Sequence, residues 1–242
     1  LVRSRGLGDV YKRQPFECLK KSGKATSEIM RGVIKNFKGF LTEKQAKDFI
    51  NTETIKKGVK PSFKPMVISG KDSSNPHWYK NKKISEGFCV IDLGASYKGW
   101  KTDMTRTLFI GRPNKKDKEK YRKVLETYKK SVKMAKRDEK ISEICKNYMK
   151  IIGEKNIKHA LGHGVGKKIH QKPKFNEKNR EKIKKECAFT IEPGYYEKNL
   201  AGIRIEDTFY KTKTGKITNL THGKTGLKTI KFIKRKKNKY QK

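Results

Sequence analysis

Apolar residues recur at helical spacing in two pairs of neighbouring segments. The first pair is a helix over about residues 25–37 and a second helix that follows the N-cap Thr42 and runs to about Ile55. The second pair is a helix capped by Asn114 and a helix near residues 141–152. The apolar faces behind these predictions comprise Ile29, Met30, Val33 and Ile34; Tyr121, Val124, Leu125, Tyr128 and Val132; and Ile141, Ile144, Tyr148 and Ile152.

Each helix pair is followed by short segments rich in β-branched and aromatic residues, which predict strands. After the first pair come residues 63–69 and a β-hairpin of residues 88–97 and 100–110, joined by Lys98-Gly99. After the second pair come strands near residues 187–192, 203–210 and 217–220. A helix pair followed by strands, repeated once, predicts an α+β domain of two similar halves.

The length and the cysteines indicate a protein that folds without disulfides. A chain of 242 residues can bury a substantial core, and Cys18, Cys89, Cys145 and Cys187 form no CxxC pair. Reduced thiols and a cytoplasmic location are therefore expected. No stretch approaches about 18 consecutive apolar residues and no signal-peptide pattern is present, so no membrane association is expected.

The net charge of +39, from 63 basic against 24 acidic residues, is far outside the balance of an ordinary enzyme. A nucleic-acid partner would explain it, because basic surfaces bind polyphosphates through counterion release. The lysines are spread through every segment, however, and do not form a stripe with interleaved aromatic residues, so a lysine-rich proteome is the favoured explanation.

The two ends of the chain differ from the segment between them. Residues 1–14 show no apolar periodicity and resemble a cloning or amplification-adapter scar, so they are excluded from the fold prediction; a preceding natural domain would then be missing. Residues 222–242 carry nine basic side chains and no acidic one, and are expected to form a basic tail with room for one short strand. The folded domain is therefore assigned to residues 15–221.

Two aspartates of the predicted hairpin are placed to share a cation. A turn at Lys98-Gly99 pairs Asp92 with Thr105 and puts Asp103 on the same face, as a diagonal neighbour about 7–8 Å away at Cα. Two such carboxylates repel each other unless a cation lies between them, and hard divalent cations prefer oxygen ligands. Because Asp92 interrupts an apolar run, a solvated strand face is the weaker interpretation, and a metal site is predicted.

Three further segments place ionisable groups between apolar residues. Three of the five histidines, His159, His163 and His170, fall within twelve positions, and this clustering favours a functional role over unrelated core or surface positions. Glu192 and Glu206 are predicted to lie inside short apolar strands, where an unpaired carboxylate is costly.

Read in order, these segments resemble the pita-bread metallopeptidases, specifically the Xaa-Pro aminopeptidase and prolidase branch. The resemblance spans roughly residues 25–221 and rests on SGKDSSNPHWY, IDLGASYKGWKTDMTRT, HALGHGVGKKIHQKP, TIEPGYY and GIRIEDT. It implies a pita-bread fold, with residues 15–221 as the catalytic domain. It also implies two divalent metal ions, manganese foremost and cobalt, iron or zinc as alternatives, held by Asp92, Asp103, His163, Glu192 and Glu206.

The resemblance further implies a division of roles. Asp92 and Asp103 would bind one ion, His163 and Glu192 would help to bind the other, and Asp103 and Glu206 would bridge the two. A hydroxide shared by the ions would attack the scissile carbonyl. Glu192 would also shuttle a proton to the leaving amine, and the remaining implied residues line the substrate site or orient ligands, namely His77, His159, His170 and Arg204.

The last ligand segment bears on the substrate. Arg204-Ile205-Glu206-Asp207 resembles the proline-directed branch, whereas methionine aminopeptidases typically lack this arginine and aspartate. The resemblance therefore implies hydrolysis of the Xaa-Pro bond at the N-terminus of peptides or in dipeptides. A methionine aminopeptidase, and a non-catalytic binding module with nucleic-acid affinity, remain the alternatives. Members of this branch often carry an N-terminal domain that supports specificity and dimerisation, so the substrate length and a homodimer stay open.

Overall fold

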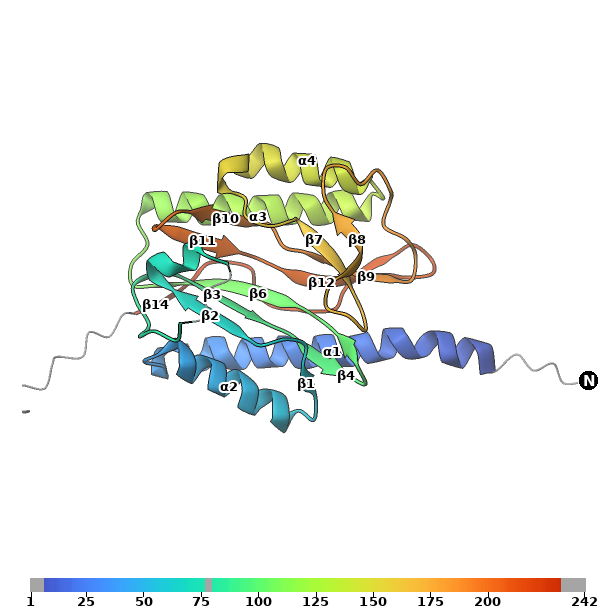
Figure 1. The fold of residues 1–242 in the computed structure, drawn as a ribbon, viewed down its shortest axis with the longest axis horizontal. Coiled ribbons are helices and arrows are strands. Elements are labelled where there is room, and N and C mark those ends of the chain that lie inside the picture. The colour runs from blue at the N-terminus through green and yellow to red at the C-terminus, as the bar shows by residue number, and fades with distance from the viewer. Residues whose placement is uncertain (1–6, 77–79, 232–242) are drawn as a thin grey trace, which may run out of the picture.

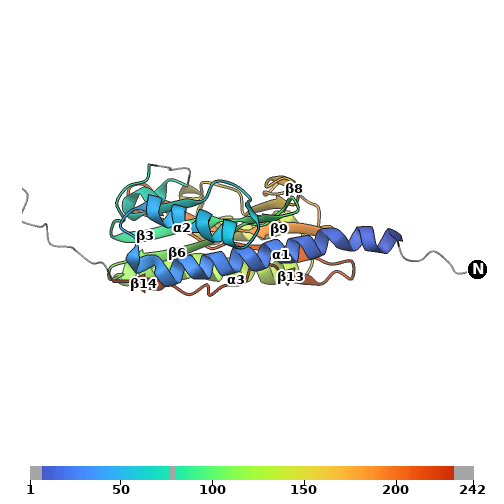
Figure 2. The same ribbon diagram turned by 90° about the horizontal axis from the view of Figure 1, so that it is seen from below.

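Layers of helices enclose the β-sheets in the computed structural model, which describes residues 7–76 and 80–231 (Figure 1). Helices α1 and α2 cover one side of the strands, and α3 and α4 cover the other. Figure 2 shows α1 running along the long axis of the molecule, with α2 beside it. The helices are α1 (Leu7–Asn36), α2 (Glu43–Lys56), α3 (Lys115–Lys136), α4 (Ile141–Ile152) and the 3₁₀ turns Phe37–Gly39, Gly70–Ser74 and Glu154–Asn156.

The strands form two main sheets, one built mostly from the first half of the chain and one from the second half. The first sheet has the order β14-β6-β3-β2, and its strands are β2 (Met66–Ser69), β3 (Gly87–Leu93), β6 (Met104–Ile110) and β14 (Lys228–Ile230). The second has the order β13-β12-β9-β7-β8, and its strands are β7 (Gly162–Val165), β8 (Gln171–Phe175), β9 (Cys187–Ile191), β12 (Asp207–Lys211) and β13 (Ile217–Asn219). Two small sheets contain β1 (Lys60–Pro61), β4 (Ala95–Tyr97) and β5 (Trp100–Lys101), and β10 (Gly194–Glu197) and β11 (Ala201–Arg204).

The predicted helix starts at Thr42 and Asn114 are confirmed. The Thr42 hydroxyl accepts a hydrogen bond from the backbone N–H of Gln45 at 3.1 Å, and the Asn114 side chain accepts one from Asp117 at 3.0 Å. In both cases the side chain of the third helical residue accepts a hydrogen bond from the backbone N–H of the cap residue, which completes a capping box. Helices α2 and α3 therefore begin where the local sequence places them.

Helix α1 is much longer than predicted, because it begins at Leu7 and not near residue 25. Part of the segment interpreted as a scar is thus helical, while residues 1–6 lie outside the described part of the chain. The added length contacts the second half of the chain: Leu19 is buried against it, and the ring of Phe16 stacks on Tyr210 with centroids 4.6 Å apart. The local spacing of apolar residues cannot predict contacts between segments so far apart in the sequence.

The register of the predicted hairpin is confirmed, but each of its two strands is broken: residues 88–97 contain β3 and β4, and residues 100–110 contain β5 and β6. Tyr97 pairs with Trp100, and Asp92 pairs with Thr105. The two turn residues, Lys98 and Gly99, have φ angles of 50° and 79°, as a two-residue turn matched to the strand twist requires.

The single strand predicted over residues 203–210 is wrong. β11 ends at Arg204 and pairs with β10, whereas β12 begins at Asp207 and pairs with β9 and β13. Between them, Glu206 makes an isolated bridge to Thr105 of β6. Glu192 likewise follows the last residue of β9. Both glutamates therefore lie where a ladder ends and not inside strands, which frees their side chains to point into a site.

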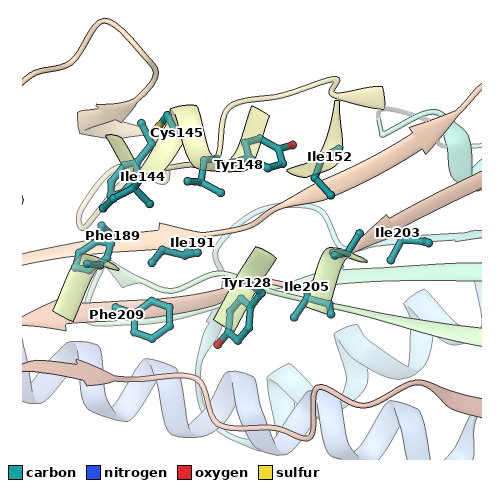
Figure 3. Packing of buried hydrophobic residues seen from close by; sticks show 14 of the residues in the cluster. Tyr128, Ile144, Cys145, Tyr148, Ile152, Phe189, Ile191, Ile203, Ile205 and Phe209 are labelled. Carbon is teal, nitrogen blue, oxygen red and sulfur yellow. The ribbon is translucent and has the colours of Figure 1, made fainter. Parts of the chain in front are cut away.

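The main hydrophobic core lies between the second sheet and the pair α3 and α4 (Figure 3). Tyr128 of α3 and Ile144 and Tyr148 of α4 face Phe189 and Phe209 of the sheet. A second core packs α1 and α2 against the first sheet. All four cysteines are free thiols. No helix in the described ranges is long and apolar enough to span a membrane.

The segment predicted to be a basic tail contributes one strand to the first sheet. β14 runs parallel to β6, with Thr229 opposite Phe109. Residues 232–242 lie outside the described part of the chain.

Candidate metal centre

All five predicted metal ligands line one cavity of about 690 Å³. Each comes from a different position of the two main sheets or their ends, and the five are Asp92 in β3, Asp103 just before β6, His163 in β7, Glu192 just after β9 and Glu206 between β11 and β12. The fold therefore brings together residues that are up to 114 positions apart, from 92 to 206.

Three of these side chains already lie at the spacing of a single ion's ligands. Asp103, His163 and Glu206 each offer a ligand atom within 4.8 Å of the other two. His163 Nε2 also lies 3.4 Å from Glu192 Oε1 and 3.8 Å from Asp103 Oδ2.

The protonation of His163 is fixed by its other ring nitrogen. His163 Nδ1 lies 3.1 Å from the carbonyl oxygen of Gly164, which can only accept, so Nδ1 carries the proton. Burial lowers the pKa of His163, which favours the neutral ring. Nε2 therefore presents a lone pair to two carboxylates, an arrangement of acceptors that a bound cation resolves.

A bound cation would also stabilise the charged form of the carboxylates in the cavity. Burial raises the pKa of Asp103, Glu192 and Glu206, and the neighbouring acidic groups raise it further for Asp103 and Glu206. Asp92 Oδ1 and Asp103 Oδ1 are buried and have no hydrogen-bond partner among the described residues. Buried oxygens without partners, grouped with an imidazole lone pair, fit divalent metal ions.

Arg204 contacts the ligand set directly. Its guanidinium donates to Asp92 Oδ2 at 2.6 Å, to the Thr105 hydroxyl at 3.0 Å and to the Tyr196 hydroxyl at 3.1 Å. Because Asp92 Oδ2 is held in this way, Asp92 Oδ1 is the oxygen left to face a cation. These contacts are those expected of a residue that orients a ligand.

Thr105 was not predicted to belong to the site. Its hydroxyl donates to Glu206 Oε2 at 2.6 Å, and its carbonyl oxygen accepts from the Glu206 N–H at 3.1 Å. Thr105 lies two residues after Asp103, on the same face of the hairpin, so the parity that located the aspartates could also have found it. It joins the two halves at the point where Glu206 enters the cavity.

His159 and His170, both predicted to line the substrate site, are found in the cavity wall. His159 Nε2 lies 2.8 Å from the Tyr196 hydroxyl, and its Nδ1 lies 3.6 Å from Glu192 Oε2. The rings of His170 and His163 meet edge to face with centroids 4.3 Å apart. His77 lies outside the described residues. Tyr196, which links His159 to Arg204, was also missed, because a buried tyrosine in a strand pattern predicts only core packing.

Asp207 points away from the cavity. Its Oδ1 accepts from Arg106 at 2.8 Å and from the Thr221 hydroxyl at 2.9 Å, and its Oδ2 accepts from the Tyr128 hydroxyl. Glu206 and Asp207 are adjacent in the chain, but the Glu206 side chain lines the cavity and the Asp207 side chain points behind it.

The sequence profile of metallopeptidase family M24 matches residues 17–213 of this chain. The chain belongs to this family. Similar proteins include an Xaa-Pro dipeptidase of Pyrococcus horikoshii, 40% identical over 162 residues that cover 64% of this chain and 46% of that protein. A putative Xaa-Pro aminopeptidase of Mycoplasma genitalium is 35% identical over 201 residues, which cover 74% of this chain and 54% of that protein. The chain thus spans about half the length of these curated relatives.

Solved structures of the family share the fold. The prolidase from Pyrococcus furiosus superposes with a TM-score of 0.81 at 31% identity, covering 90% of this chain and 68% of that one. A recombinant prolidase from Thermococcus sibiricus gives a TM-score of 0.82 at 27% identity, covering 90% and 61%. The α+β pita-bread fold expected from the sequence is confirmed by these similarities.

Proposed function

We propose that this chain is the catalytic part of a metal-dependent peptidase that hydrolyses the Xaa-Pro bond, at the N-terminus of peptides or in dipeptides. The observation that carries the proposal is the cavity in which four carboxylates gather beside His163, with two buried carboxylate oxygens lacking any described partner. Relatives named Xaa-Pro dipeptidase and structures named prolidase support the choice of substrate.

The residues that would hold two divalent ions are those predicted from the sequence, Asp92, Asp103, His163, Glu192 and Glu206. Manganese is the first choice among metals, with cobalt, iron or zinc as alternatives, since carboxylate and imidazole donors suit all four. Such ions, when bound, lower the pKa of water and polarise a carbonyl oxygen.

The chain's own residues supply orientation and proton transfer. Glu192 lies between His159 and His163, with its two oxygens 3.6 Å and 3.4 Å from their ring nitrogens, so it is placed to carry a proton toward a leaving amine. Arg204 fixes Asp92, and Thr105 fixes Glu206. His159 and His170 line the space where a substrate would lie.

The experiment compares three substrates, an Xaa-Pro dipeptide, an Xaa-Pro-Yaa tripeptide and a Met-initiated peptide, each with manganese or cobalt added. We expect hydrolysis of an Xaa-Pro substrate by the wild type and none by Asp103→Ala. Cleavage of the Met-initiated peptide alone would indicate a methionine aminopeptidase. If wild type and Asp103→Ala were equally inactive on all three, the chain would not be a peptidase.

A further inference from the structure

The tip of the β4–β5 hairpin contacts the loop that carries His170. The hairpin belongs to the first half of the chain, whereas this loop, residues 166–170 between β7 and β8, belongs to the second half. The backbone N–H of Lys101 in β5 donates a hydrogen bond to the carbonyl oxygen of Gly166 at 2.9 Å. The two halves therefore meet at the hairpin tip, four positions before a residue of the cavity wall.

Lys167 makes two further contacts between the same segments. Its ammonium group donates a hydrogen bond to the carbonyl oxygen of Lys98 at 2.9 Å, and Nζ lies 5.0 Å from the centroid of the Trp100 ring. An ammonium group at this distance from an indole ring is attracted by the negative face of the ring. Both contacts hold the Lys167 side chain against the hairpin tip, so Lys167 fixes the loop to the other half of the molecule.

The loop has little freedom between Lys167 and His170, which are three positions apart. Ile169, the residue before His170, packs with Trp100 against a small hydrophobic cluster that includes Val165. The backbone that leads to His170 is therefore anchored near the hairpin tip at both Lys167 and Ile169. A displacement of Lys167 would be transmitted through this short segment to His170.

The His170 ring depends on this backbone for its position. It lines the cavity and meets the His163 ring edge to face, with centroids 4.3 Å apart. Within residues 7–76 and 80–231, no hydrogen bond or ion pair holds the His170 ring, and the residue is exposed. The His159 ring, by contrast, is held by the Tyr196 hydroxyl. An exposed side chain without a polar partner changes rotamer easily, unless its backbone restricts it.

We propose that Lys167 is a positioning residue for His170. By fixing the β7–β8 loop to the hairpin tip, it sets where the His170 ring stands in the space for a substrate. This inference rests on the proposed function and deepens it, because it gives a surface lysine a part in shaping the cavity. Lys167 itself does not line the cavity, so it acts through His170 and not on the substrate.

The first test measures the position of the His170 ring and does not depend on turnover. Carbon–proton NMR records the histidine ring signals of the zinc-loaded protein, since Zn²⁺ is diamagnetic. The variant His170→Gln identifies the His170 signals by their loss. Lys167→Met, which keeps an unbranched side chain but removes the ammonium group, should move these signals toward those of a histidine in an unfolded peptide, because the ring current of His163 no longer acts on them. Lys167→Arg should leave them close to wild type, since a guanidinium also donates to carbonyl oxygens and stacks on aromatic rings.

Lys168→Met is the matched control, because Lys168 is an exposed neighbour that does not line the cavity. It also removes one positive charge, and it should leave the His170 signals unchanged. Unchanged His170 signals in Lys167→Met, or an equal change in Lys168→Met, would overturn the proposal.

The second test is a double-mutant cycle on kcat/KM for Ala-Pro with manganese added. Lys167→Met should lower kcat/KM about tenfold when His170 is present, because a small displacement of an aligned group is costly. When His170→Gln is already in place, Lys167→Met should lower it by less than about twofold. Lys167→Arg should stay within about threefold of wild type.

The cycle separates positioning from a general effect on the fold. A tenfold loss from Lys167→Met in both backgrounds would show that Lys167 does not act through His170, and would overturn the proposal. If the wild type cleaves no Xaa-Pro substrate while the His170 signals respond to Lys167→Met as expected, the proposed function is refuted and the role of Lys167 in placing His170 stands.

Discussion

Two arginine–aspartate pairs join the two halves of the molecule, and they differ in whether both aspartate oxygens have a hydrogen-bond partner. Arg204 and Asp92 meet at 2.6 Å in the cavity, and Arg106 and Asp207 meet at 2.8 Å behind it. Both oxygens of Asp207 accept hydrogen bonds from protein groups, whereas Asp92 Oδ1 has no described partner. Buried polar groups are normally satisfied, so the incomplete pair is the one built for a ligand.

The surroundings of the two arginines lead to the same distinction. Arg106 also donates to the carbonyl oxygens of Glu206, Lys224 and Gly223, so it ties the strand break to the segment before β14. Arg204 donates to side chains that line or support the cavity. We therefore expect changes behind the cavity to lower stability and changes inside it to lower activity.

The largest effect is expected for Asp92→Asn, which keeps the side-chain volume but removes the charge that the cavity presents to a cation. We expect kcat/KM for Ala-Pro to fall about 10³-fold, equivalent to about 4 kcal/mol of transition-state stabilisation. The free energy of unfolding, from urea denaturation without metal, should change by less than about 1 kcal/mol, because the loss of the ion pair with Arg204 is offset by weaker repulsion between Asp92 and the carboxylates of Asp103 and Glu206. Activity within tenfold of wild type would remove Asp92 from the proposed ligands.

Asp207→Asn is expected to lower stability and to leave activity largely unchanged. It leaves the buried guanidinium of Arg106 without its counter-charge, so the free energy of unfolding should fall by about 3 kcal/mol in urea denaturation. Activity per folded molecule should stay within about threefold of wild type. Asp48→Asn, which breaks the exposed pair with Lys44, is the control and should cost less than about 1 kcal/mol. Lost activity at unchanged stability would contradict the division between the two pairs.

Substitutions of two threonines of β6 should distinguish an effect on metal binding from an effect on stability. Thr105→Val removes the hydroxyl that holds Glu206 and accepts from Arg204, so metal affinity measured by calorimetry should weaken about 10- to 100-fold. Thr107→Val is the matched control, because the Thr107 hydroxyl forms hydrogen bonds with the backbone of Arg204 and not with a proposed ligand. It should cost about 1–2 kcal/mol of stability with metal affinity retained. Equal losses of metal affinity in both variants would mean that Thr105 acts only through the fold.

The smallest effect is expected for Tyr128→Phe. This change removes one donor to Asp207, while the bonds from Arg106 and Thr221 remain. Unfolding should become easier by about 1 kcal/mol, measured by urea denaturation, and metal binding should be unchanged. A change in metal affinity here would show that the pair behind the cavity also controls the ligands.

Local patterns anticipated much of the first half of the site. The turn at Lys98-Gly99 fixes the register of the hairpin, and a side-chain period of two then fixes which residues share the face of Asp92. The same reasoning could have located Thr105. In the second half, the order of the motifs and their family resemblance named His163, Glu192 and Glu206, but their residue spacing alone gives no geometry.

The sequence by itself determined the helix caps, the hairpin register and the residue types that suit a metal, because these depend on neighbours a few positions apart. Only the tertiary structure decided that the predicted strand breaks at Glu206 and that α1 continues to Leu7. It also decided that, of the two aspartates paired with an arginine, Asp92 keeps an oxygen with no hydrogen-bond partner among the described residues. Each of these depends on packing between segments far apart in the chain, where burial and the satisfaction of hydrogen bonds outweigh local preference.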